Sequence, residues 1–341
     1  MENEIKIIEK LVSEMEAQLI EAYSIGALLY SPATNEFLYE KLMDHSFGEK
    51  FSLALCLEDS IDDSAVEIGE RNIVDLFTKI KANYNQFAFL PKLFIRVRCP
   101  EQMIKLYQAL ENCSDLLCGF ILPKFSLDNA VPYLKNIEQI NQTSGHTIYI
   151  LPILESNDIV PLKTRTSLLT SIYDHVIHYK PYILNIRVGG NDLCHTFGTR
   201  RTIRQSIYDI RPIANILSDI ITTFHHDFVI SGPVWEYFSD ADGEWKSGLE
   251  RELQLDLLNG FVGKTVIHPN QISVVNNALK VNRHDLEDAL SILSFDHSAR
   301  QVAKSSEGTR MNEVKTHTNW ARRQLLLSHI YGIAAATNDK E

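Results

Sequence analysis

The sequence predicts an α/β protein, a TIM (β/α)8 barrel with a C-terminal helical arm. Eight short β-rich segments alternate with stretches of helical length, which is the pattern that repeated βαβ units produce. Most of these segments end in polar or charged residues, as expected where the carboxyl ends of parallel strands form the mouth of a barrel. A doubly wound open sheet is the alternative, but no GxGxxG turn follows the first segment. The predicted strands cover residues 26–32, 51–57, 93–97, 119–123, 147–153, 182–188, 227–231 and 263–268.

The pattern divides the chain into three regions. Residues 1–25 have the acidic amphipathic pattern of a helix, and residues 26–271 hold the eight barrel units with the candidate metal site. Residues 272–341 are too few and too helical to add further barrel units. We expect them to form an arm or lid that packs on a neighbouring subunit or excludes water from the barrel mouth.

Composition restricts the classes of partner. The chain has 341 residues, of which 45% are hydrophobic and 23% charged, as in folded soluble proteins. A net charge of −11 argues against a nucleic-acid or anionic-membrane partner. No apolar run approaches the roughly 20 residues that span a bilayer, and the N-terminus lacks a signal-peptide layout. Five scattered cysteines without a CxxC pair indicate a reducing compartment, so we expect a cytoplasmic protein.

Two carboxylates follow neighbouring strands. Glu155 comes after ILPIL and Asp192 after the next apolar segment, and no excess of Cys or His accompanies them. Such a pair favours a hard, oxygen-ligated cation such as Mg²⁺, although strand-end acids also cap helices. Gly189 and Gly190 would let backbone amides approach a ligand oxygen.

Charged pairs lie at the ends of the second and third predicted strands. Glu58 and Asp59 could orient a metal-bound water or hold a basic residue, or they could cap the next helix. Arg96 and Arg98 are two residues apart and so lie on the same face of a strand. Arginine suits a bidentate grip on a carboxylate, and a structural salt bridge with Glu58 is the alternative.

Single residues follow the fourth and eighth predicted strands. Lys124 could balance the carboxylates, touch substrate or form a Schiff base, and a solvated lysine is the alternative. His268 completes the mouth, although a histidine at one strand end is more often packed and hydrogen-bonded than catalytic.

Taken together, these motifs resemble the citrate lyase β-subunit-like group of the HpcH/HpaI aldolase and malyl-CoA lyase superfamily. The resemblance runs from about Gly26 to Ala336. Three segments are most similar to a divergent branch found beside tellurite-resistance and stress genes, namely ILPKF, RVGGNDL and GTRMNEVKTHTNWA. The matching segments are LLYSPAT, Leu57–Ile61 (L-E-D-A-V), Ile95–Val97 (V-R-V), Leu122–Lys124 (L-P-K), Leu154–Ser156 (I-E-T/S), Gly189–Leu193 (G-x-x-D-L) and Gly263–Gln271 (G-K-x-x-I-H-P-x-Q).

The resemblance implies roles for particular residues. Glu155 and Asp192 correspond to the family's Mg²⁺ carboxylates, with Mn²⁺ as an alternative metal, and Arg96 to the arginine that binds a substrate carboxylate. Glu313 corresponds to an acid that, in the acyl-CoA branches, reaches a neighbouring subunit's site. The family and the arm together imply a homo-oligomer, a trimer or a larger closed assembly.

Three departures bear on the substrate. Cys56 replaces the family's usual acid two residues before Glu58, and Arg98 replaces an asparagine. The basic residue expected before the first strand is also missing. These changes leave the metal pair intact but leave open whether a CoA thioester is used. A second arginine favours a smaller, more anionic ligand such as a free or phosphorylated oxoacid.

The expected function is that of a Mg²⁺-dependent carbon–carbon bond lyase of the aldol or retro-Claisen type. It would act on a 2-oxo or 2-hydroxy acid or its acyl thioester through a metal-stabilised enolate. Glu58, Asp59 and Glu313 are candidates for the general base, and the sequence does not rank them. One rival is a phosphoenolpyruvate-type transferase or mutase on a related barrel. The other is a non-catalytic metabolite-binding component of a stress or tellurite-resistance system.

Overall fold

The computed structural model describes residues 2–294 and 302–335 of the chain. Two compact units are present, and each is treated by itself. The barrel unit is Ile25–Val275, and the helical unit combines Met1–Ser24 with Asn276–Glu341.

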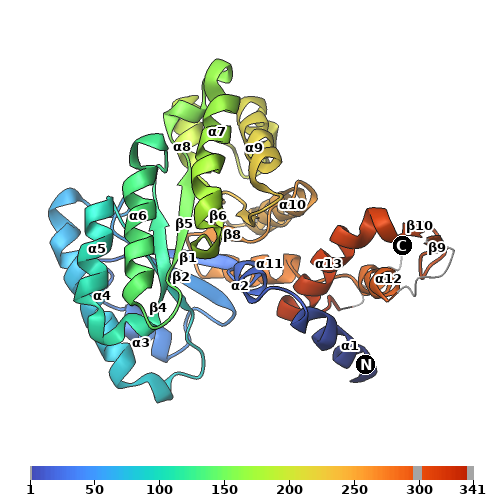
Figure 1. The fold of residues 1–341 in the computed structure, drawn as a ribbon, viewed down its shortest axis with the longest axis horizontal. Helices are drawn as coiled ribbons and strands as arrows, with labels where there is room; N and C mark the ends of the chain where they lie inside the picture. Colours follow the sequence, from blue (N-terminus) through green and yellow to red (C-terminus); the bar gives the residue numbers. More distant parts are fainter. Residues whose placement is uncertain (1, 295–301, 336–341) are drawn as a thin grey trace. The chain divides into compact units, whose positions relative to one another are not determined.

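The barrel unit contains eight parallel strands ringed by helices (Figure 1). The strands pair in the order β7-β6-β5-β4-β3-β2-β1-β8, and a bridge between Gly232 and Lys264 connects β7 to β8. This ring confirms the TIM barrel predicted from the sequence. The strands are β1 (Ala27–Pro32), β2 (Phe51–Cys56), β3 (Lys92–Arg96), β4 (Leu117–Leu122), β5 (Tyr149–Leu154), β6 (Ile186–Val188), β7 (Ile230–Ser231) and β8 (Lys264–Val266).

Apolar side chains on both faces explain why these segments are strands. Every residue of β2 is buried, because one face meets the barrel interior and the other meets the surrounding helices. The last three strands are shorter than predicted. In β6, the segment before the strand forms the 3-10 helix η5 (Ile177–Tyr182), which contains Pro181. Proline has no N–H for a ladder bond, and β6 begins only at Ile186.

Helices cover the outside of the strands and are capped by local sequence. Pro100 lies in the first turn of α5, and Ser126 with Asn129 forms a capping box at the start of α6. Their apolar stripes face inward, as at Ile213, Ile216 and Ile220 of α9. The helices are α3 (Leu38–Met43), α4 (Val66–Ala82), α5 (Pro100–Ala109), α6 (Leu127–Thr143), α7 (Leu162–Val176), α8 (Gly190–Thr196), α9 (Arg211–Phe224), α10 (Glu244–Leu258) and α11 (Asn270–Ala278). Further 3-10 helices are η1 (Asp63–Ala65), η2 (Tyr84–Gln86), η3 (Glu111–Leu116), η4 (Asn157–Ile159) and η6 (Ile207–Asp209).

A buried ion network joins β8 to α10. Lys264 Nζ lies 3.0 Å from Glu252 Oε1 and 2.6 Å from Asp256 Oδ2, with the side chains at or below 2% exposure. Arg201 adds a second cation 3.4 Å from Glu252, and the hydroxyl of Tyr208 donates to Asp256 at 2.7 Å. Two cations therefore balance two carboxylates inside the wall, and each charge depends on the others for compensation.

The helical unit packs the N-terminal helices against α13 from the C-terminal region. Its helices are α1 (Glu2–Ser13), α2 (Ala17–Tyr23), α12 (Arg283–Leu293) and α13 (Val314–Tyr331), and α13 contacts the other three. The hydroxyl of Tyr331 donates to the carbonyl of Tyr23 at 2.7 Å. An antiparallel pair, β9 (Val302–Lys304) and β10 (Met311–Glu313), lies within the region that the sequence predicted to be a helical arm. Residues 295–301 and 336–341 of the predicted arm lie outside the described residues.

No helix within residues 2–294 and 302–335 combines the length and the apolar character needed to cross a membrane.

Candidate active site

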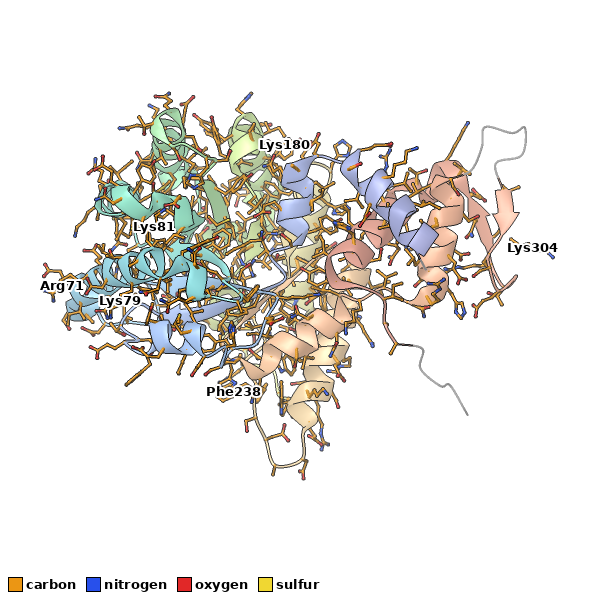
Figure 2. The ribbon with its side chains drawn as sticks, turned by 90° about the horizontal axis from the view of Figure 1, so that it is seen from below. Arg71, Lys79, Lys81, Lys180, Phe238 and Lys304 are labelled. Atoms are coloured by element: carbon orange, nitrogen blue, oxygen red, sulfur yellow. The ribbon has the colours of Figure 1, made fainter. Side chains whose placement is uncertain are left out.

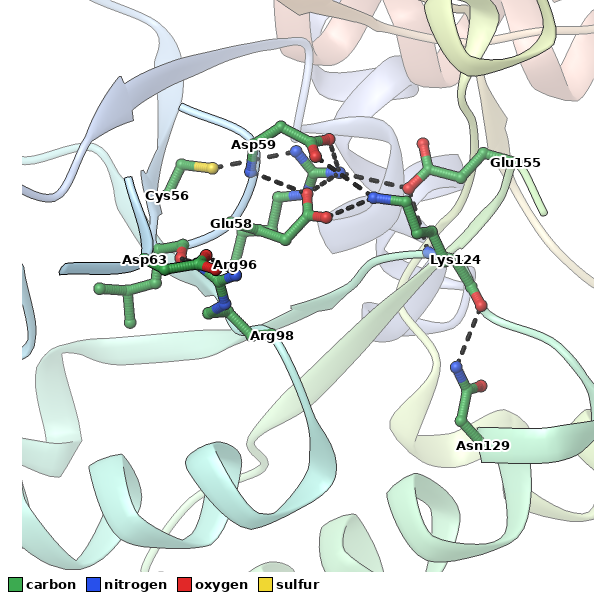
Figure 3. A network of polar contacts seen from close by, with 10 residues as sticks. Cys56, Glu58, Asp59, Asp63, Arg96, Arg98, Lys124, Asn129 and Glu155 are labelled. Carbon is green, nitrogen blue, oxygen red and sulfur yellow. Dashed lines mark hydrogen bonds and ion pairs between the residues drawn. The ribbon is translucent and has the colours of Figure 1, made fainter. Parts of the chain in front are cut away.

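Arg96, the last residue of β3, is the centre of a charged network at the strand ends (Figure 3). Its Nη2 lies 2.7 Å from Glu58, 3.1 Å from Asp59 and 3.2 Å from Glu155. Its Nη1 meets only the thiol of Cys56, at 3.9 Å, and its buried Nε has no hydrogen-bond partner in the described chain. The Nη2 group is thus committed to carboxylates, while Nη1 and Nε retain donors.

Lys124 connects two parts of this network through an unusual backbone conformation. Its φ of 47° lies in the left-handed region, which is costly for a residue with a Cβ. In this conformation its amide donates to Glu155 Oε1 at 3.0 Å, and its ammonium pairs with Glu58 and, at 3.2 Å, with Asp59. Burial opposes the charge, but the bond to Glu58 and the nearby acids raise the pKa of Lys124 overall. A protonated lysine fits charge compensation better than a Schiff-base role.

Glu155 is buried against Gly189. The carboxylate follows β5 and is 4% exposed. A Cβ at position 189 would overlap Glu155 Oε2 and Cβ and lie 2.9 Å from Cδ, so glycine makes room for this side chain. Oε1 accepts from Arg96 and from the amide of Lys124, whereas no described residue donates to Oε2. Burial raises the pKa of Glu155 to about 7, and the charge of Asp192 adds to this, against the effect of Arg96.

Asp192 is the second carboxylate of the candidate metal pair. It lies in the first turn of α8, is half-buried, and its side chain makes no hydrogen bond or ion pair with a described residue. Within the described ranges, no group of three or more His, Cys, Asp and Glu side chains is arranged to hold a metal. A cation here would therefore have two protein carboxylates and leave its other positions to water or substrate.

The formal charges fit a divalent cation. Arg96 and Lys124 contact Glu58, Asp59 and Glu155, and Asp192 adds a fourth carboxylate whose charge acts on Glu155, so the formal charges of these six side chains sum to −2. Mg²⁺ would neutralise this charge and relieve the repulsion between Glu155 and Asp192.

Glu58 and Asp59 are adjacent but have different environments. Burial and a hydrogen bond with Asp59 raise the pKa of Glu58, although Arg96 and Lys124 oppose the change. Burial also acts on Asp59, but its bond with Glu58 and the two cations lower its pKa overall. A pair separated in this way suits one group that exchanges a proton and another that stays ionised.

Arg98 and Gly190 lie apart from this network. Arg98 comes after the end of β3, donates to Asp63 and to the carbonyl of Leu57, and has a side chain 32% exposed. The two arginines therefore have separate carboxylate partners. Gly190 packs against Pro233, where a Cβ would lie 2.8 Å from the proline ring. The amide of Gly189 already donates to Leu154 at 3.3 Å.

His268 stacks on Phe238, with ring centroids 4.5 Å apart and planes at 9°. Figure 2 shows Phe238 on the segment that precedes α10. The Nδ1 of His268 accepts from the amide of Asn270 at 3.2 Å, and burial together with Lys41 lowers the pKa of the ring. His268 is thus a packed, hydrogen-bonded side chain with no contact to Arg96 or Glu155.

Glu313 belongs to the helical unit. It ends β10, its amide donates to His317 Nδ1 at 2.9 Å, and its carboxylate accepts from Thr316 at 3.1 Å. These contacts are local to the start of α13.

Comparison with known proteins assigns the chain to a family. The chain matches the family described as a C-C bond lyase of the TIM-barrel fold over residues 19–333. It belongs to this lyase family. No curated protein matches it.

Solved structures agree on the fold. The lyase superposes with a TM-score of 0.67 on a citrate lyase from Burkholderia xenovorans LB400, at 14% identity over 92% of this chain and 94% of that one. The CitE protein of Mycobacterium tuberculosis in complex with magnesium, acetoacetate and coenzyme A gives 0.59 at 17% identity, covering 89% and 98%. The citrate lyase β subunit of that organism with oxaloacetate and magnesium gives 0.50 at 16% identity, covering 75% and 98%.

Two residues near the site, Tyr30 and Arg187, were not predicted from the sequence. Tyr30, in β1, lies with its ring 5.8 Å from the Cζ of Arg96. Arg187, in β6, is 1% exposed in the barrel interior. The sequence signal that could have identified Arg187 is its position inside an apolar strand. Arginine is rarely buried completely, so a buried arginine indicates a special role.

Proposed function

We propose that this lyase uses Mg²⁺ to make or break a carbon–carbon bond in a 2-oxo or 2-hydroxy acid or its acyl thioester. The observation that carries the proposal is the arrangement of Glu155 and Asp192, two interacting carboxylates with free oxygens beside a buried arginine. The magnesium, oxaloacetate and acetoacetate in the structures of similar proteins support this choice of metal and ligand class.

Glu155 and Asp192 would hold the metal, with Mn²⁺ as an alternative. When bound, Mg²⁺ supplies polarisation of the substrate carbonyl and stabilises the negative charge that develops on its oxygen. Arg96 and the amide of Lys124 fix the position of Glu155 through bonds of 3.2 and 3.0 Å. Ligands oriented by such outer contacts bind metal more tightly than mobile ones.

Arg96 would also bind the substrate carboxylate. Its Nη1 and Nε are the donors available, since Nη1 contacts only the weak acceptor Cys56 and Nε has no partner in the described residues. An acid at position 56 would occupy these donors. The cysteine therefore favours a ligand that brings its own carboxylate to Arg96.

Glu58 would act as the general base or acid that takes or returns the substrate proton. Its side chain is 12% exposed and is held by Arg96 and Lys124, and its raised pKa makes it a better proton acceptor than an ordinary carboxylate. Asp59, with its lowered pKa, would stay ionised and keep Lys124 in place. Glu313 of the helical unit is a third acid, proposed on the family resemblance alone.

Solvent exchange of the methyl protons of pyruvate tests the proposal without a second substrate. We expect the protein with Mg²⁺ to incorporate deuterium into pyruvate, followed by NMR. Glu58→Gln should slow the exchange by about 10²–10⁴-fold, the usual contribution of a positioned acid or base. Glu70→Gln is the matched control, because Glu70 is a buried acid of α4 bonded to Gln102 and Lys105. Equal exchange rates in all three proteins, or no dependence on Mg²⁺, would contradict the proposal.

Family membership favours lyase chemistry over a transferase or mutase and over a non-catalytic role. A CoA thioester substrate, a trimeric or larger assembly, a cytoplasmic location and a link to tellurite resistance stay predictions. Substrate contacts by Arg98, Lys124, Gly189, Gly190 and His268 stay predictions as well.

A further inference from the structure

Arg187 is a buried cation that forms no ion pair with a carboxylate of the described residues. Its Nη2 donates to Thr265 Oγ1 at 2.7 Å and its Nη1 to Asn185 Oδ1 at 3.2 Å, and both acceptors are neutral. Its Nε is buried and has no hydrogen-bond partner in the described chain. Burial lowers the pKa of this arginine, and Tyr30 acts in the opposite direction. An uncompensated buried charge is costly and needs an explanation.

The side chain of Arg187 crosses the barrel interior. In the sheet order, β7 lies between β6 and β8, so Thr265 is not on a neighbouring strand. Tyr30, on β1, is one strand further away and accepts a hydrogen bond from Arg187. Both contacts therefore lie across the interior of the barrel, away from the surrounding helices.

Tyr30 connects Arg187 to the candidate active site. It is half-buried near the end of β1, and its ring lies 5.8 Å from the Cζ of Arg96. The charges of Arg96, Arg187 and Glu155 all act on its phenol. The hydroxyl donates to no described residue, so its hydrogen is available to a ligand. Burial raises the pKa of Tyr30 despite the two arginines, which keeps the phenol protonated and a donor.

We infer that Tyr30, positioned by Arg187, binds the ligand by donating its hydroxyl to an anionic oxygen of the oxoacid. The inference rests on the proposed function for the identity of the ligand. Arg187 polarises the phenol from behind, since a phenol oxygen that accepts from a cation is a stronger donor. The ligand's negative charge then compensates the buried guanidinium. Arg187 is a positioning residue that acts through Tyr30.

Binding of pyruvate in the presence of Mg²⁺, measured by calorimetry, tests this inference. Tyr30→Phe keeps the ring and removes only the hydroxyl, and Arg187→Met keeps the length and removes the charge. Each should weaken pyruvate binding about tenfold, as expected for one charge-supported hydrogen bond. The double variant should bind pyruvate about as tightly as either single variant, because both substitutions remove the same interaction. Mg²⁺ affinity should stay within about twofold of wild type, which a general loss of structure would not allow.

Arg165→Met is the matched control. Arg165 is a buried arginine of α7 that donates to the carbonyls of Ile159 and Val160 and to Asp219, and these bonds do not involve Tyr30, Arg96 or Glu155. Its loss should lower the melting temperature without changing pyruvate affinity. Arg187→Met should leave the melting temperature of the ligand-free protein unchanged or raise it, because a buried unpaired charge is removed.

Three outcomes would overturn the inference while leaving the proposed function intact. They are unchanged pyruvate binding in both variants, fully additive losses in the double variant, and an Arg187→Met protein that loses stability and Mg²⁺ affinity together. If wild type binds no pyruvate, the proposed function fails. The inference is then tested with malonate, through the melting temperature of the protein with and without this dicarboxylate. A malonate-induced rise in melting temperature that disappears in both variants supports it. A rise of equal size in all proteins, or no rise in wild type, overturns it.

Discussion

Replacement of Gly189 by alanine should displace Glu155 and disable the metal pair. The φ of −94° and ψ of 84° at this position are open to alanine, so the effect is one of space and not of backbone strain. The added Cβ would overlap Glu155 Oε2 and Cβ, and Glu155 is too enclosed, at 4% exposure, to move without breaking its bonds.

The magnitude follows from those bonds. Glu155 would lose its contacts with Arg96 at 3.2 Å and with the amide of Lys124 at 3.0 Å. Hydrogen bonds to charged groups contribute roughly 1.5–3 kcal/mol each. Relief of the repulsion from Asp192 offsets part of the loss, so we expect the free energy of unfolding to fall by about 2–4 kcal/mol. Mg²⁺ affinity should fall about 10–100-fold, the usual effect of disturbing a ligand's support.

Urea unfolding and Mg²⁺ calorimetry measure the two effects. Gly145→Ala is the control, because a Cβ at Gly145 meets nothing within 4 Å. The reasoning is refuted if Gly189→Ala binds Mg²⁺ as tightly as Gly145→Ala does. A loss of stability without a loss of Mg²⁺ affinity would equally contradict the role of Glu155 as a ligand.

Three further predictions concern charge. Arg96→Lys keeps the charge but loses the planar guanidinium, so its pyruvate affinity should fall about tenfold or more. Arg98→Lys is the comparison: because its partner Asp63 is exposed, the variant's pyruvate affinity should change less than about threefold. A proton on Glu155 competes with Mg²⁺, because the pKa of this carboxyl is raised to about 7. The affinity for Mg²⁺ should therefore be full above neutrality and about tenfold lower at pH 6 than at pH 8. Equal Mg²⁺ affinities at the two pH values in calorimetry would exclude this competition. Lys264→Met should cost about 3–5 kcal/mol in urea unfolding because it leaves buried carboxylates unpaired, and a smaller cost would mean that the network is not compensating charge.

The barrel was predictable because apolar strands and helix-length connections recur with a regular order along the chain. Each of the eight predicted segments overlaps a strand of the structure, and the errors lie in the bounds of the strands, as in β6 after Pro181. Strand-end positions also placed Glu58, Arg96, Lys124 and Glu155 correctly, because parallel strands bring their carboxyl ends to one edge.

Other features depend on contacts that strand order does not encode. Arg98 was expected to share a face with Arg96, but the chain has left β3 by that point and the side chain reaches Asp63. The close packing of Glu155 against Gly189 is a further contact of this kind, and the approach of a ligand to the backbone there stays a prediction. Tyr30 and Arg187 meet across the barrel interior, and sequence separation gives no sign of such a contact.

The association of the N-terminal helices with α13 was also beyond sequence reasoning. Both segments are amphipathic, but an apolar stripe does not specify which partner covers it. The hydroxyl of Tyr331 on the carbonyl of Tyr23 joins positions at opposite ends of the chain.

Calorimetric titration of the chelator-treated protein with Mg²⁺ tests the central claim most directly. Wild type and Glu70→Gln should bind one Mg²⁺ per chain, while Glu155→Gln and Asp192→Asn should each lose at least about 100-fold in affinity, because each removes one of two protein carboxylates. Binding of Mg²⁺ that is equal in all four proteins would place the metal elsewhere, and no binding in wild type would remove the basis for metal-dependent chemistry at this site.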